Sequence, residues 1–108
     1  MSVTPGFRSF VEDQLEAILP IHTRAMFGGV GIYTEGVFFA LMAEDVLYLK
    51  VDERTLGDYE ARGLRAFRPH GPDGVEMAYR EIPAELLEDP AELRPWVEKA
   101  VEVALRAR

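Results

Sequence analysis

The chain has 108 residues, of which 48% are hydrophobic and 29% charged, and this composition is typical of one folded domain that can bury a core. Acidic residues outnumber basic ones by 19 to 12, and a net charge of −7 disfavours a protein that holds nucleic acid unaided. The absence of cysteine excludes disulfides, thiolate metal sites and cysteine nucleophiles.

The chain also lacks the sequence signals of a membrane or secreted protein. No stretch approaches the ~18 consecutive apolar residues that a membrane span requires. The N-terminus has neither the basic nor the apolar region of a signal peptide. We therefore expect a cytoplasmic protein with a single domain over residues 1–108 and no membrane association.

The first predicted element is a helix that begins at Thr4-Pro5. Threonine is a good N-cap, and proline suits the first helical position because its missing N–H is not needed there. We expect Pro20 to end this helix. The apolar residues that follow at helical spacing are Phe7, Phe10, Val11, Leu15 and Ile18.

Four strand-like segments follow in close succession. They cover residues 22–27, 30–33, 37–42 and 46–51. The connections contain Gly28-Gly29, Thr34-Glu35-Gly36 and Ala43-Glu44-Asp45. Parallel neighbours need a crossover of a dozen residues or more, so these short connections predict an antiparallel sheet. In the last segment, alternate residues are expected to face opposite sides of the sheet.

The second half of the chain predicts two helices separated by a hairpin. Asp52 is expected to cap a helix over residues 53–62, with Gly63 as its stop. Segments 66–69 and 75–80 predict a hairpin around the turn at residues 71–74. Asp89-Pro90 repeats the cap-and-proline start, and the apolar stripe that follows consists of Leu93, Trp96, Val97, Ala100, Val101, Ala104 and Leu105. The order helix, four strands, helix, two strands, helix predicts an α+β fold, an antiparallel sheet with flanking helices.

The cluster Gly28-Gly29-x-Gly31 is the first candidate for a binding site. Glycine-rich loops hold phosphates where backbone N–H groups converge at a helix N-terminus. Here the glycines lie between two strands and no helix follows, so neither a P-loop nor a dinucleotide fingerprint is present. This context favours a tight turn or bulge that needs positive φ or close backbone approach.

Arg24 and Lys50 are cations on otherwise apolar strands. If the two strands are neighbours on one face, this pair could bind an anion; the alternative is that both reach the sheet edge and pair with acids. His22 and His70 are far apart in sequence and form neither a zinc pattern nor a catalytic triad. We therefore expect no metal, no cofactor and no catalytic residue.

Four arginines form the largest basic concentration in the sequence: Arg62, Arg65, Arg68 and Arg80. With aromatic residues nearby, they could form a small patch for nucleic acid or an acidic partner. The favoured alternative is a solvated face whose charge is balanced by Glu60, Glu76 and Glu81. Trp96 is compatible with a partner surface, but its position in the apolar stripe favours packing in the core.

Several segments together resemble the TfoX/Sxy N-terminal domain family. The most specific one is Arg24-Ala25-Met26-Phe27-Gly28-Gly29-Val30-Gly31-Ile32-Tyr33, and a second is Leu47-Tyr48-Leu49-Lys50-Val51-Asp52. The later matching positions are Met77, Tyr79, Ile82-Pro83, Leu87-Glu88-Asp89-Pro90, Leu93 and Trp96. The resemblance extends in order along almost the whole chain.

This resemblance implies a compact α+β domain similar to the secretion-chaperone-like architecture. Members of the family include bacterial regulators of natural competence, which resemble transcriptional co-regulators that work with the cyclic-AMP receptor protein. The family brings no enzymatic activity and no assigned catalytic residues. Competence regulators carry a second, C-terminal domain, so this chain resembles a stand-alone member. Many relatives also have an aromatic residue where this chain has Arg80.

From the residues and the resemblance we expect a non-enzymatic regulatory module that binds a protein of the transcription machinery, as a monomer or homodimer. The expected partner or anion surface consists of Arg24, Tyr48, Lys50 and Tyr79. The motif residues Met26, Phe27, Gly28, Gly29 and Gly31 are expected to be structural. Two alternatives are a small-ligand or anion-binding domain centred on Arg24, Lys50 and the glycine turn, and weak nucleic-acid binding through the four arginines.

Overall fold

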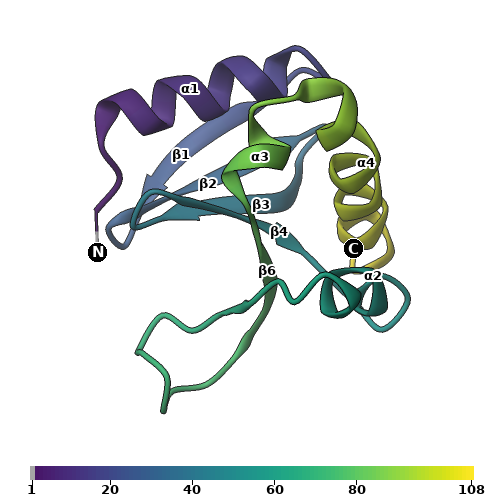
Figure 1. Ribbon diagram of the computed structural model, residues 1–108. Coiled ribbons are helices and arrows are strands. Elements are labelled where there is room, and N and C mark those ends of the chain that lie inside the picture. The colour runs from purple at the N-terminus through teal and green to yellow at the C-terminus, as the bar shows by residue number, and fades with distance from the viewer. Residues whose placement is uncertain (1) are drawn as a thin grey trace.

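A six-stranded antiparallel sheet with the strand order β1-β2-β3-β4-β6-β5 forms the centre of the computed structural model, which describes residues 2–108 (Figure 1). The elements in chain order are α1 (Pro5–Glu16), β1 (His22–Met26), β2 (Gly29–Thr34), β3 (Val37–Ala43), β4 (Val46–Lys50), α2 (Leu56–Ala61), β5 (Ala66–Phe67), β6 (Met77–Ile82), α3 (Ala84–Leu87) and α4 (Pro90–Arg106). The predicted α+β class and antiparallel sheet are confirmed.

Strands β1 to β4 form a meander whose three hairpins all turn through two residues of positive φ. These pairs are Phe27-Gly28, Glu35-Gly36 and Glu44-Asp45. Two consecutive positive-φ residues are the feature of type I′ turns, whose twist matches that of the flanking strands. Two of the turns use glycine, whereas the third holds two acidic residues in this conformation.

The chain leaves the meander after β4 and returns to it in reverse order. Strand β6 pairs with β4, with Leu47 opposite Ile82 and Lys50 opposite Tyr79, and β5 lies outside β6. The predicted second hairpin is therefore present, but its strands are Ala66–Phe67 and Met77–Ile82 instead of 66–69 and 75–80. The long loop between them hangs below the sheet, on the side away from α1 (Figure 1).

The helix ends differ from the sequence expectation where local hydrogen bonds compete with the helix. Helix α1 ends at Glu16 instead of Pro20, because Ile18 N and Leu19 N both donate to Leu15 O and tighten the last turn. The N-cap of α2 is Thr55 and not the predicted Asp52, and the helix is shorter than 53–62. The reason is a turn before the helix, in which Asp52 Oδ1 accepts from Arg54 N at 3.0 Å. Helix α3 has only four residues and was not predicted.

The helices pack against one side of the sheet. Helix α1 lies across the top of the sheet and α4 stands beside it (Figure 1). Burial therefore alternates along β4. Leu47 and Leu49 are fully buried against the helices, while Tyr48 and Lys50 project from the other side of the sheet. The largest fully buried side chains include Phe39, Leu15, Ile32, Met42, Leu93 and Val97. No helix within residues 2–108 combines the length and apolar character needed to cross a bilayer.

The N-cap of α1 is tied to the turn between β3 and β4. Thr4 N donates to Asp45 Oδ1 at 2.8 Å, and the Thr4 hydroxyl donates to Oδ2 at 2.9 Å. That hydroxyl in turn accepts from Phe7 N at 3.3 Å. One carboxylate therefore orients the capping residue and fixes the start of α1 on the sheet.

We predict that Asp45→Ala lowers the free energy of unfolding by about 1 kcal/mol, because two hydrogen bonds to the N-cap are lost. Glu44→Ala is the matched control, since its residue also has positive φ but its side chain makes no hydrogen bond within residues 2–108. Urea denaturation of both variants measures the difference. Equal stability of the two variants would contradict a structural role for the carboxylate.

Tyr59 places a polar group in the core, and its effect on stability can be tested. Its side chain is fully buried, its ring meets Trp96 edge-on at 4.8 Å, and its hydroxyl has no hydrogen-bond partner within residues 2–108. A buried hydroxyl without a partner costs about 1–3 kcal/mol. We expect Tyr59→Phe to stabilise the protein by about 1 kcal/mol in urea denaturation, and Tyr33→Phe to change stability less. A loss of stability in Tyr59→Phe would show that the hydroxyl has a partner.

Candidate functional site

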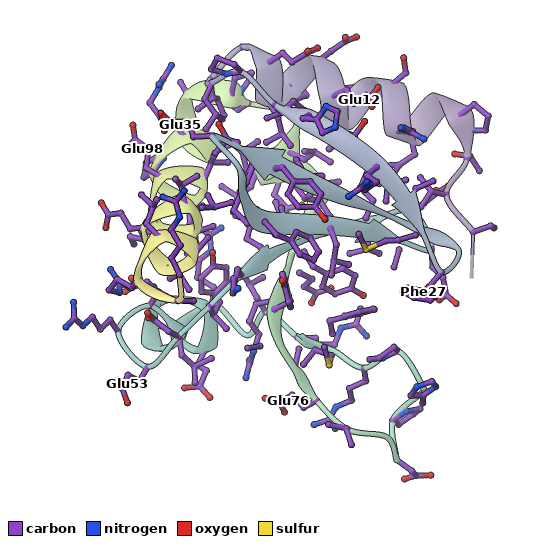
Figure 2. All side chains as sticks on the ribbon, turned by 180° about the vertical axis from the view of Figure 1, so that it is seen from behind. Glu12, Phe27, Glu35, Glu53, Glu76 and Glu98 are labelled. Atoms are coloured by element: carbon purple, nitrogen blue, oxygen red, sulfur yellow. The ribbon has the colours of Figure 1, made fainter. Side chains whose placement is uncertain are left out.

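The side of the sheet that no helix of residues 2–108 covers is the candidate site, and we call it the open face. Figure 2 views the molecule from behind, with this side toward the reader. The strand register places Arg24 opposite Gly31, Gly31 opposite Leu41, Leu41 opposite Tyr48, and Tyr48 opposite Glu81. Paired residues project to the same side of a sheet, so this row crosses the open face from β1 to β6.

Aromatic rings lie next to one another across the open face. Their centroid distances are 6.5 Å for His22–Tyr33, 5.0 Å for Tyr33–Phe38, 6.0 Å for Phe38–Tyr79 and 4.7 Å for Tyr48–Phe67. Rings at these distances attract each other beyond the effect of the area they bury. The open face is thus an aromatic surface on which neighbouring rings partly cover one another.

An apolar groove of about 260 Å³ lies on the open face between the β1–β2 turn and the β5–β6 loop. None of the residues that line it is charged. Its lining includes Met26, Phe38, Leu41, Phe67, Met77 and Tyr79. No helix in the described part of the chain covers this side, so the groove opens to solvent and can receive apolar side chains from another molecule.

The glycine motif shapes both the turn and the groove. Gly28 has φ of 80°, which a side chain would strain. A Cβ at position 29 would lie 2.6 Å from the backbone oxygen of Met42, so Gly29 allows two strands to approach closely. A Cβ at position 31 would lie 2.7 Å from Met26 Cε, so Gly31 leaves space on the open face for the Met26 side chain.

Phe27 stands at the tip of the β1–β2 turn. Its side chain is 99% exposed, and its φ of 46° is uncommon for a bulky residue. Figure 2 shows it at the end of this turn, pointing away from the molecule. Met77, which lines the groove from β6, is also exposed. Exposed apolar side chains gathered around a groove are typical of an interaction surface.

Arg24 and Lys50 both lie on the open face but are not neighbours. They belong to β1 and β4, which are separated by three strand spacings, or about 14 Å. The prediction that they bind one anion together required neighbouring strands, and this requirement is not met. Arg24 instead borders a separate shallow cavity with His22 and Tyr33.

The other two expected surface residues lie near Lys50. Tyr79 is opposite Lys50 on β6, and Tyr48 precedes it by two residues on β4. Burial raises the pKa of the Tyr79 phenol, and the Tyr33 side chain raises it further. Burial also raises the pKa of the Tyr48 phenol, with a further contribution from Glu81. Both phenols therefore stay protonated at neutral pH and can donate hydrogen bonds.

The four arginines of the second hairpin do not form a free basic patch. Arg65 pairs with Glu81 at 3.2 Å, Arg68 with Glu76 at 2.9 Å, and Arg80 with Glu76 at 3.5 Å and Glu60 at 3.8 Å. The guanidinium of Arg62 lies 5.6 Å from the ring centre of Trp96. Trp96 itself is partly buried against the core.

The sequence did not indicate the groove residues Phe38, Leu41 and Phe67, and it indicated Met77 only as a matching position of the family resemblance. Strand β3 is apolar on both sides, which predicts a central strand but does not indicate that one side lacks a helix. The aromatic and methionine content of the strands was the available signal. Within residues 2–108, no group of three or more His, Asp or Glu residues is placed to hold a metal ion.

The family model described as the TfoX N-terminal domain matches residues 13–104 of this chain. The matched segment contains all six strands, and with them the glycine motif, the open face and the groove. Among curated proteins, none matches the chain.

The two strand glycines give a test of how the groove is built. Gly29→Ala places a methyl group against rigid backbone, so we expect a loss of about 2 kcal/mol or more in the free energy of unfolding. Gly31→Ala meets the flexible end of Met26, so the expected loss is about 1 kcal/mol or less. Urea denaturation distinguishes the two. A larger effect at Gly31 would contradict this assignment.

Proposed function

This chain belongs to the TfoX N-terminal domain family, and from this premise we propose that it is a regulatory module that binds a protein partner through its open face. The observation that carries the proposal is the apolar groove with the fully exposed Phe27 at its border. An exposed aromatic side chain in a strained turn gains nothing from folding, whereas a partner can bury it.

The dimensions of the site favour a polypeptide over a small molecule. Small-molecule sites are clefts of about 300–1,000 Å³ that bury most of the ligand, and the groove, at about 260 Å³, is close to the lower limit of this range. The aromatic surface also continues beyond the groove to Tyr33 and His22, whose rings are in contact but do not line it. A broad aromatic surface with one central apolar depression is typical of a protein interface.

The proposed setting is transcription. The family includes bacterial competence regulators, so we infer that the partner is a component or regulator of the transcription machinery. The proposal assigns no catalytic step to the chain, and the open face contributes anchoring apolar contacts. The pairing of Arg65, Arg68 and Arg80 with carboxylates supports a protein partner over nucleic acid at the second hairpin.

Affinity capture from the native host with surface variants tests this function. We expect the wild-type chain to retain a protein of the transcription machinery, and Phe27→Ser and Met77→Ser to lose it because both border the groove. The matched controls are Phe10→Ser on α1 and Leu105→Ser on α4, whose side chains are exposed elsewhere. Urea denaturation verifies that all four variants fold.

Two outcomes would reject the proposal. One is the absence of any specifically captured protein. The other is a partner that all four variants retain equally, because it would then bind away from the open face.

A further inference from the structure

The charged residues on the strands of the open face differ in sign from those of most of the molecule. The chain has 19 acidic residues, yet β1 to β4, residues 22–26, 29–34, 37–43 and 46–50, contain none. On β6, Glu81 faces the same side as Tyr48 but forms a salt bridge with Arg65. The strands β1 to β4 therefore present Arg24 and Lys50 without a carboxylate of their own. Acids of the adjoining turns border the open face, since Glu35 lines the same cavity as Arg24 and Glu44 helps to raise the pKa of the Tyr48 phenol.

Arg24 and Lys50 are unpaired although acids are in excess. Neither side chain takes part in a salt bridge or side-chain hydrogen bond within residues 2–108. The cations that do form salt bridges are Arg8, Arg65, Arg68, Arg80, Arg94, Lys99 and Arg106. Two free cations on the open face are thus available to a partner.

The groove lies between these two cations. On β1, Arg24 precedes the lining residue Met26 by two positions and projects from the same face. On β4, Lys50 is opposite Tyr79, which lines the groove from β6. A bound segment whose apolar side chain fills the groove would therefore have a cation on either side of that anchor.

We propose that the partner contributes an acidic segment, in which an aromatic or large aliphatic anchor enters the groove and flanking Asp or Glu side chains pair with Arg24 and Lys50. This inference rests on the proposed function and specifies the chemistry of its partner. The ~14 Å between the two strands corresponds to about four residues of an extended segment or about nine of a helix. The protonated phenols of Tyr48 and Tyr79 add hydrogen-bond donors for the same carboxylates.

The open face of a second copy of the chain is a poor partner for this groove, because it carries the same cations. Two open faces in contact would bring Arg24 and Lys50 of each copy together, where β1 to β4 offer no carboxylate to neutralise them. Like charges across an interface disfavour association. The charge pattern therefore favours an acidic partner over a dimer in which two open faces meet.

Selection of peptides from a random dodecapeptide display library on the full chain tests the inference. We expect enriched peptides to combine one or two large apolar residues with flanking Asp or Glu. Binding of an enriched peptide, measured by fluorescence polarisation, should weaken roughly tenfold in Arg24→Glu and in Lys50→Glu, because attraction becomes repulsion. It should also weaken as salt is raised.

Matched controls reverse a charge away from the open face. Arg54→Glu and Arg108→Glu replace exposed cations that form no salt bridge within residues 2–108, and we expect them to change the affinity less than twofold. Phe27→Ser and Phe10→Ser provide the corresponding pair for the apolar contact.

Three results would overturn the inference. The first is a selection that enriches neutral or basic peptides, which would reject the acidic partner. If a host protein were still captured through the groove, the proposed function would nevertheless stand. Arg24→Glu and Lys50→Glu variants that bind like the controls would place the peptide elsewhere. A dimer in sedimentation velocity that Phe27→Ser dissociates would assign the open face to a second copy.

Discussion

The burial of the helices against only one side of the sheet is the constraint on which the rest of the structure depends. Val11 and Leu15 of α1 and the apolar stripe of α4 exclude water from that side completely. Burial of apolar surface is the main favourable term in folding, so this single layer of helices provides most of the core. The same arrangement leaves the other side of an apolar sheet without a covering layer, and the open face follows from it.

Because no helix covers the open face, the chain has to limit the exposed apolar area by other means. Tyr33 and Phe38 stack on adjacent strands, and the β5–β6 hairpin brings the Phe67 ring against Tyr48 in a tilted arrangement. Gly31 lets Met26 lie close to β2. These contacts cover part of the surface, and what they leave is the groove. The motif that resembles the family signature thus contributes to the shape of the proposed site through its backbone.

Charge distribution separates the open face from the remaining surface. The acidic residues lie on helices, turns and the second hairpin, where several pair with arginines, while β1 to β4 carry only Arg24, Lys50 and His22 as basic groups. The cations of the open face disfavour contact with a second open face and with other basic surfaces. The apolar groove would then supply affinity and the cations orientation, which is the usual division of roles in a protein interface.

The sequence determined the local structure of this protein well. Thr4-Pro5, Asp89-Pro90 and the short connections predicted where helices begin and that the strands are antiparallel, because capping and turn chemistry act over a few residues. It also identified Arg24, Tyr48, Lys50 and Tyr79 as unusual, and all four lie on the open face.

Only the tertiary structure decided how these elements are arranged. Three features depend on contacts between segments that are distant in sequence. They are the insertion of β6 between β4 and β5, the separation of Arg24 from Lys50 by three strand spacings, and the groove formed by Phe38, Leu41 and Met77. An apolar strand such as β3 looks the same in sequence whether one or both of its sides are covered. Which side remains open is fixed by where the helices pack, and local sequence patterns do not encode that choice.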